Sequence, residues 1–288
     1  MDWNNLKVAL AIGQTGSLTR AAQVLGVDTS TAGRRLSALE ADLGVMLFVR
    51  TKAGFAMTDA GAVAIKRAVD VQNRIEQLID EVTEPADGPI GTIRLASNTW
   101  IVDRLAQTAV PSFLETHPMI DLCTTVRPAD SLAQGGVSLS LWFETEPKDG
   151  AFKISLGKVP YAIYRSRKAE GGKPGWVAFH DEKMTTPLIE RANRRLKKRD
   201  EPLRFTSTDA GVLLSAVSAG LGKGLLPMCL AEDDERVVRV SAGEPVLERV
   251  LYVHAYHDTV QTRRVQAAIK WLRESFDAVF QPRFTETV

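Results

Sequence analysis

The chain is poor in several features that define secreted, membrane-bound or catalytic proteins. No run of eighteen apolar residues occurs, and the amino terminus lacks a basic region followed by an apolar stretch. Neither a transmembrane helix nor a signal peptide is therefore predicted, and we expect a soluble, cytoplasmic protein. The only two cysteines, Cys123 and Cys229, lie in an apolar strand-like run and at the start of a helical one, and both are interpreted as buried small side chains.

Motifs for common catalytic and metal-binding chemistry are missing as well. The sequence contains no zinc motif, phosphate-binding loop or serine nucleophile elbow. Gly220, Gly222 and Gly224 follow a helical segment and precede Leu-Leu-Pro, which is the wrong context for a dinucleotide fingerprint. His254 and His257 are the only histidines close together, which is a weak basis for a metal site. We therefore predict no enzymatic activity, no metal and no cofactor.

Basic charge is not in excess either. The 288 residues carry a formal net charge of +1, and residues 1–89 hold nine Lys and Arg against eleven Asp and Glu, a net of −2. Charge alone therefore gives no indication of a nucleic-acid partner. With 44% hydrophobic and 25% charged residues, the composition fits a globular chain of two or three domains.

Residues 13–43 show a distinctive local pattern, two short helices joined by a glycine turn. Ser17 is a good N-cap for a helix over Leu18–Leu25, Gly26 permits a sharp turn, and Asp28 caps the next helix. One stripe of that second helix is apolar at intervals of three and four, at Ala32, Leu36, Leu39 and Leu43. The pattern predicts a helix-turn-helix and points to DNA, although such helix pairs also occur inside ordinary helical domains.

The outward side of the second helix is free to enter a major groove, where arginine binds guanine and hydroxyls bond bases or phosphates. Residues 46–58 indicate two short strands around a basic Lys-Ala-Gly tip, a wing beside the helix pair. Because phosphate contacts release counterions, we expect binding to weaken as salt rises. The predicted DNA-binding residues are Ser17, Arg20, Thr29, Ser30, Thr31, Arg34, Arg35, Arg50, Thr51 and Lys52.

The first eighty-odd residues resemble the LysR-type transcriptional regulators. The resemblance is carried by Gly16–Ala22, Arg34–Glu40, Leu43–Gly44, Leu47–Arg50 and Met57–Gly61. It implies a winged helix-turn-helix over residues 1–60, promoter DNA as a partner, contact with RNA polymerase, and assembly as a homodimer or homotetramer. Where the family commonly opens its recognition helix with a Ser-Gln-Pro-like stretch, this chain has Asp28–Thr31, so no target sequence is implied.

A long helix is predicted from Asp59 to about Val82, with residues 61–84 as a linker and 85–90 as a hinge. Its apolar residues are spaced four and three apart, at Ala64, Ala68, Val71, Ile75, Leu78 and Val82. This spacing is typical of a coiled-coil seam, and the alternative is a helix packed on its own domain. The resemblance favours dimerisation, with an interrupted inverted repeat as the target. Pro85 and Pro89 end the helix.

Residues 91–288 alternate strand-like and helical runs, which predicts an α/β fold with a largely parallel sheet. Strands are expected at 92–97, 120–126, 137–143, 161–164, 176–179, 204–206 and 251–256, and helices at 104–117, 187–199, 209–219 and 260–280. This region resembles the LysR-type effector domain, itself similar to type 2 periplasmic binding proteins. Lobe one is expected over about 91–160 and 247–288, and lobe two over about 161–246.

A small-molecule effector is expected between the lobes at the strand ends, where open sheets leave a crevice. Arg127 would pair with a carboxylate, and free N–H groups at the turn before Asp209 would favour an anion. The alternative is that these side chains cap helices or fill the core. The predicted effector-binding residues are Ser97, Asn98, Thr99, Trp100, Arg127, Trp142, Thr206, Ser207 and Thr208.

Residues 191–199 carry six positive charges, which we interpret as a solvated helix face, with a second nucleic-acid site as the alternative. For the whole chain the sequence favours an effector-controlled, DNA-binding transcriptional regulator. Alternatives are a ligand-independent global regulator and a small-molecule-binding or catalytic protein that uses the helix pair for dimerisation. A regulatory disulfide remains a further alternative, since some LysR-type regulators sense oxidants.

Overall fold

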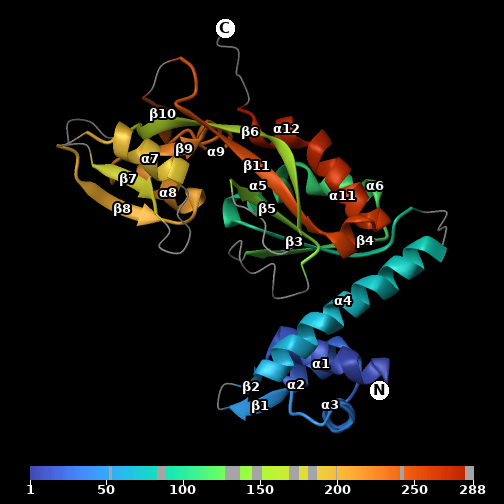
Figure 1. Cartoon of the computed structure of the whole chain (residues 1–288). Helices are drawn as coiled ribbons and strands as arrows, with labels where there is room; N and C mark the ends of the chain where they lie inside the picture. The colour runs from blue at the N-terminus through green and yellow to red at the C-terminus, as the bar shows by residue number, and fades with distance from the viewer. Residues whose placement is uncertain are drawn as a thin grey trace. The chain divides into compact units, whose positions relative to one another are not determined.

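The computed structural model describes residues 1–51, 54–82, 88–126, 137–144, 151–168, 175–180, 187–198, 200–240 and 243–282. Of these residues, 1–82 form one compact unit and 88–282 form another (Figure 1). No helix within the described ranges is long and apolar enough to cross a membrane. No group of three or more His, Cys, Asp or Glu among the same residues is placed to hold a metal ion.

The first unit is a winged helix-turn-helix, as predicted. Its elements are α1 (Trp3–Thr15), α2 (Leu18–Val24), α3 (Thr29–Leu43), β1 (Phe48–Thr51), β2 (Gly54–Met57) and α4 (Asp59–Val82). Helix α1 was not predicted from the sequence. It contributes Val8, Ala9 and Ile12 to a core that α2 and α3 share. Gly26 adopts a φ of 63° at the turn, a conformation that glycine reaches without strain.

Helix α4 divides into two parts by burial. Ile65 and Ala68 are buried in the core of the first unit, against α1 and the wing. Further along the helix Val71 and Leu78 are exposed, by 42% and 56%. Ala68, an early position of the predicted seam, therefore packs within its own domain, whereas the later positions Val71 and Leu78 are uncovered among the described residues.

The second unit contains a mixed sheet with the strand order β4-β3-β5-β11-β6-β9-β7-β8, and β10 pairs with β6. Its strands are β3 (Gly91–Ser97), β4 (Ile120–Val126), β5 (Leu139–Phe143), β6 (Ala151–Ser166), β7 (Trp176–Phe179), β8 (Leu203–Ser207), β9 (Lys223–Pro227), β10 (Val237–Arg239) and β11 (Leu247–Tyr256). The pairs β3–β4, β3–β5, β7–β8 and β7–β9 are parallel. The long central strands β6 and β11 pair antiparallel with each other and with their other neighbours. The expectation of a largely parallel sheet is therefore wrong at the centre, where two long strands run through both lobes.

The helices of this unit are α5 (Thr99–Thr108), α6 (Val110–Thr116), α7 (Pro187–Leu196), α8 (Ala210–Ser218), α9 (Met228–Ala231), α10 (His257–Val260), α11 (Arg263–Glu274) and α12 (Phe276–Phe280). The helix predicted over 104–117 begins earlier, at Thr99, and breaks at Ala109. Pro111 lies in the first turn of α6, and its missing N–H explains the break. The single helix predicted over 260–280 corresponds to two helices, α11 and α12, with caps at Thr262 and Ser275, and to the last residue of α10.

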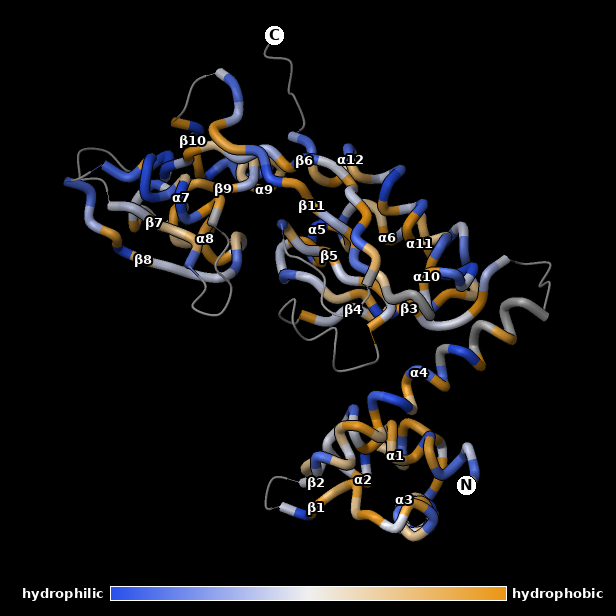
Figure 2. Tube along the Cα trace, viewed as in Figure 1, coloured by the Kyte–Doolittle hydropathy of each residue, from blue (hydrophilic) through white to orange (hydrophobic). Residues whose placement is uncertain are grey.

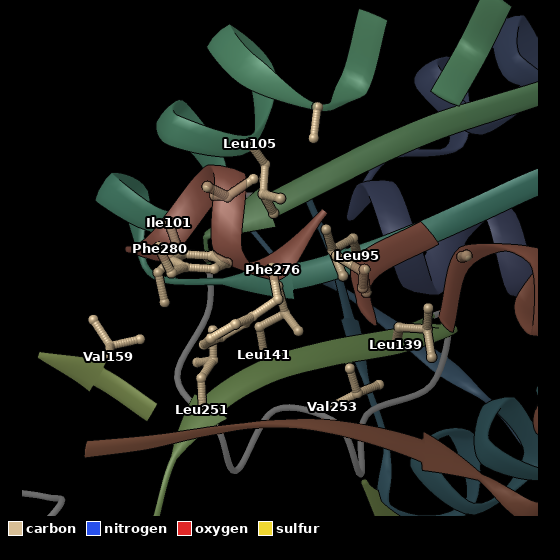
Figure 3. Packing of buried hydrophobic residues seen from close by; sticks show 14 of the residues in the cluster. Leu95, Ile101, Leu105, Leu139, Leu141, Val159, Leu251, Val253, Phe276 and Phe280 are labelled. Atoms are coloured by element: carbon tan, nitrogen blue, oxygen red, sulfur yellow. The ribbon is translucent and has the colours of Figure 1, made fainter. Parts of the chain in front are cut away.

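Apolar side chains form two main clusters in this unit, and the larger one includes residues of both lobes. In lobe one, Leu95, Leu139, Leu141 and Val253 of the sheet pack against α5 and α12 (Figure 3). In lobe two, the main cluster joins α8 to the ends of β6, β7 and β9, through residues such as Leu213, Val217, Tyr164, Val177 and Leu226. The outcome is the two-lobed α/β architecture that the sequence predicted.

The prediction that both cysteines are buried is correct for one of them. Cys229 is buried in α9, whereas Cys123 is exposed. Strand β4 is at the edge of the sheet, and Ile120 is its only buried residue. The apolar run around Cys123 therefore reflects an edge strand that is largely uncovered.

Candidate functional sites

Recognition helix α3 begins with a closed network of hydrogen bonds around Asp28. The Asp28 carboxylate accepts from the Thr31 N–H at 2.8 Å, the Ser30 hydroxyl at 2.5 Å and the Thr31 hydroxyl at 2.6 Å. These bonds stabilise the carboxylate and hold the pKa of Asp28 well below its usual range. In the absence of DNA, the hydroxyls of Ser30 and Thr31 are thus committed to the cap of their own helix.

The outward side of α3 carries the cations. Ala32, Leu36 and Leu39 are buried, whereas Thr29, Ser30 and Arg34 are exposed and Arg35 is half-buried. Arg34 donates to the Thr31 hydroxyl at 3.1 Å and makes no ion pair within the described residues. Its guanidinium is therefore available for the bidentate contact that arginine makes with guanine.

The neighbouring elements place the remaining predicted DNA-binding residues. Ser17 caps α2 by accepting from the Arg20 N–H at 3.4 Å, and the Arg20 side chain is exposed. The N–H of Phe55 donates to the Gly16 carbonyl at 2.9 Å, which ties the wing to the turn before α2. Arg50 lies over the Phe55 ring at 5.4 Å, and the Thr51 hydroxyl donates to the Gly54 carbonyl at 3.1 Å. Lys52 lies outside the described residues.

Glu40 positions the wing, a role that the sequence reasoning missed. Its buried carboxylate accepts from the N–H groups of Leu47 and Phe48 at 2.7 and 3.2 Å. A Cβ at Gly61 would collide with the Leu47 carbonyl, so glycine allows α4 to approach the same point. The sequence could have predicted that Glu40 is buried, because it lies four residues after Leu36 on the inward stripe of α3.

At the strand ends of lobe one, some predicted effector residues already use their side chains in packing or hydrogen bonds within the protein, and others do not. Ser97 is fully buried and donates to the Leu141 carbonyl at 2.9 Å. Trp100 is buried and stacks on Phe143, with ring centroids 6.1 Å apart. Packing is therefore the observed role of both side chains. Asn98 begins α5 without a capping bond from its side chain, and Thr99 is exposed.

Two other predicted effector residues require comment. Trp142 is buried in β5, and its indole N–H has no hydrogen-bond partner among the described residues. Arg127, the expected partner of a carboxylate, lies outside the described residues. Neither residue adds an observed contact to the strand-end site.

In lobe two, the turn before α8 is already occupied by a carboxylate from the chain itself. Asp209 accepts from the N–H groups of Gly211 and Val212 at 2.8 and 3.2 Å. The expectation of free N–H groups for an anion is therefore wrong, because Asp209 caps the helix. The Ser207 hydroxyl accepts from the Asp209 N–H at 3.2 Å, whereas Thr206 and Thr208 are exposed.

Helix α5 joins the predicted residues of the two lobes. The second oxygen of Asp209 accepts from the N–H of Trp100 at 3.4 Å. One turn later, buried Arg104 forms an ion pair with Asp233 at 2.8 Å. The starts of α5 and α8, which are more than one hundred residues apart in sequence, thus share one carboxylate.

A further ion pair lies beside this junction and was not predicted. Glu144 follows β5 with a φ of 52°, unusual for a residue other than glycine. Its carboxylate meets the buried Arg249 of β11 through two contacts, at 3.1 and 3.3 Å. Arg249 also lies 4.4 Å from the Phe143 ring and donates to the Tyr161 hydroxyl at 3.5 Å. Burial raises the pKa of Tyr161 to about 12, so this hydroxyl stays protonated.

Known protein families match both units. A family model described as "Bacterial regulatory helix-turn-helix protein, lysR family" matches residues 3–62. A second model, described as "LysR substrate binding domain", matches residues 86–277. The matched ranges include the α2–α3 pair, the wing, and nearly all of the two-lobed unit.

Individual proteins show the same similarity. HTH-type transcriptional regulator YofA of Bacillus subtilis is 27% identical over 258 residues, which cover 83% of this chain and 86% of YofA. HTH-type transcriptional activator AllS of Salmonella typhi is 26% identical over 248 residues, 80% of each chain.

Solved structures share the fold over nearly the whole chain. A full-length OxyR variant from Pseudomonas aeruginosa has a TM-score of 0.74 at 16% identity and covers 100% of this chain and 99% of its own. Full-length LysG from Corynebacterium glutamicum, with bound effector Arg, has a TM-score of 0.60 at 18% identity and covers 98% and 100%. The chain therefore belongs to the LysR family of bacterial helix-turn-helix proteins, and it is a DNA-binding transcriptional regulator with a C-terminal effector-binding domain.

Proposed function

We propose that this regulator reads promoter DNA with α3 and responds to a small molecule that binds where α5 and α8 begin. The DNA-reading part rests on the exposed side of α3, where Arg34 has no counter-ion among the described residues. The proposed contacts are Ser17, Arg20, Thr29, Ser30, Thr31, Arg34, Arg35, Arg50, Thr51 and Lys52. Ser30 and Thr31 would exchange their bonds to Asp28 for bonds to DNA.

The effector part rests on the hydrogen bond between Trp100 N–H and Asp209, which brings two predicted clusters together. Asn98, Thr99, Thr206 and Thr208 supply polar side chains there, with Arg127 as a proposed partner for a carboxylate. LysG, a protein of the same fold, is described with arginine as its bound effector. A small polar effector fits this chemistry.

The proposed assembly is a homodimer, or a homotetramer built from two dimers. It is supported by the exposed apolar residues Val71 and Leu78 of α4, which a second copy of the helix would cover. The proposed targets are interrupted inverted repeats in promoters, the place of action is the cytoplasm, and RNA polymerase is a further partner. Effector binding would shift the population of lobe arrangements and so change promoter occupancy, without any enzymatic step.

Replacement of Arg34 tests the DNA-reading part. We expect Arg34→Ala to weaken specific binding by roughly 5- to 150-fold, since a bidentate arginine–guanine contact contributes about 1–3 kcal/mol. Operator affinity would be measured by fluorescence anisotropy, with the melting temperature and oligomeric state measured in parallel.

Arg67→Ala is the matched control. Arg67 is an arginine of the same unit, its side chain is 77% exposed, and its one ion pair within the described ranges is with Asp70 on α4. This variant removes the same charge from a surface outside α3 and should bind DNA nearly as the wild type does. Unchanged binding by Arg34→Ala, or an equal loss in both variants, would contradict the proposed role of α3.

A further inference from the structure

Helix α7 presents a row of cations on its outer side. Arg191, Arg194 and Arg195 lie three and four residues apart in the helix, and Lys198 follows its end. All four side chains are exposed, and Figure 2 shows both hydrophilic and hydrophobic stretches along the helix. We call these residues the α7 cationic face.

The opposite side of α7 fixes this orientation. Ile189 is buried in the core, and buried Asn193 accepts from the Trp176 indole N–H at 3.0 Å. Because Trp176 is itself fully buried in β7, the helix cannot rotate without breaking this bond. The cations therefore point outward as a consequence of the fold.

The two nearest carboxylates that form ion pairs in the described residues pair with other groups. Glu190 approaches His180 at 3.9 Å, and buried Glu201 forms an ion pair with Lys223 at 2.7 Å. Within the described ranges, no ion pair involves any of the four cations. Like charges four residues apart, such as Arg191 and Arg195, repel each other and destabilise a helix. An external anion would remove this repulsion.

We propose that the α7 cationic face binds the phosphate backbone of duplex DNA outside the segment that α3 reads. From Arg191 to Arg195 the helical part of the face spans about 6 Å, at about 1.5 Å per helical residue. Duplex DNA carries one negative charge per about 1.7 Å of axis, so several phosphates would lie within reach of the face. The proposal gives the regulator a source of affinity that carries no base specificity.

Two observations favour DNA over an acidic protein as the partner. No aromatic residue lies among the cations, whereas protein interfaces are anchored by buried aromatic and apolar side chains. In addition, residues 1–89 have a net charge of −2. The winged helix-turn-helix therefore contributes only a few local cations to the binding of a polyanion. A second cationic face on the same chain would supply additional phosphate contacts.

The test compares two full-length variants of equal charge. Arg194→Gln/Arg195→Gln removes two cations from the face, and Lys270→Gln/Arg273→Gln removes two exposed cations from α11. Each protein is titrated with a random-sequence duplex of about 20 base pairs, two helical turns, and with one about three times longer. The measured quantity is the slope of log affinity against log salt concentration, and circular dichroism checks folding.

On the long duplex, we expect the slope of the α7 variant to fall by about 1–2, since each phosphate contact contributes about 0.9. The α11 variant should match the wild type on both duplexes. An α7 variant that matches the α11 variant on the long duplex would overturn the proposal.

Discussion

The two cysteine thiols lie in opposite environments. Cys229 is buried in α9, and burial raises the pKa of its thiol to about 12. Cys123 is exposed on edge strand β4. Because the thiolate is the reactive form, a raised pKa lowers the reactive fraction of Cys229 throughout the physiological pH range.

We expect iodoacetamide at about pH 8, near the ordinary cysteine pKa, to modify Cys123 in the folded protein and to leave Cys229 intact. Raising the pH should increase the reactivity of Cys229 only as the pH approaches 12. Peptide mass spectrometry with and without denaturant would measure both sites. A link between Cys123 and Cys229 after peroxide treatment would contradict this account and support a regulatory disulfide.

Among the elements, α5 and α8 share the carboxylate of Asp209. One oxygen caps α8 through two N–H groups, and the other accepts from the first turn of α5. Asparagine can cap α8 in the same way, but its amide nitrogen cannot accept the Trp100 N–H. The two roles of Asp209 can therefore be separated by substitution.

Hydrogen exchange tests this separation. We expect Asp209→Asn to accelerate exchange at the start of α5 and to leave α8 nearly unchanged. Asp209→Ala should accelerate exchange at both helix starts, because it also removes a cap worth about 1 kcal/mol. Exchange would be followed by mass spectrometry on peptides covering 99–108 and 210–218. Acceleration confined to α8 in both variants would show that the hydrogen bond between the Trp100 N–H and Asp209 does not stabilise the start of α5.

Local signals predicted much of the first unit. The caps Ser17 and Asp28, the turn at Gly26 and the apolar spacing of α3 all act within a few residues of sequence. The start of α5 was missed because Asn98 makes no capping bond and α5 is held instead by Asp209.

Contacts between distant residues explain what the sequence did not indicate. Strand β6 runs far beyond the predicted residues 161–164 because it pairs with β11, about ninety residues later. Glu144 and Arg249 are separated by 105 residues, and no local pattern at either position predicts that the two side chains form an ion pair. The capped start of α8 also depends on Asp209, which sequence reasoning treated as the first residue of the helix and not as its cap. Arg127 and Lys52 lie outside the described residues and remain predictions.

For the whole molecule, family membership and the proposed sites combine into one account. The first unit would select DNA through α3, and α4 would pair two copies of the chain. When a small molecule binds, the two-lobed unit would shift its population of lobe arrangements and so change promoter occupancy. The α7 cationic face would add affinity without sequence preference. Among the proposed contacts, Arg34 is the residue on which the sequence selectivity of DNA binding depends most.

The most direct test incubates sheared genomic DNA of the source organism with wild-type protein and with Arg34→Ala, and sequences the retained fragments. The account predicts a few sharp sites for the wild type, which share an interrupted inverted repeat and are absent with the variant. Diffuse retention that is equal for both proteins, or no enrichment with either, would contradict it.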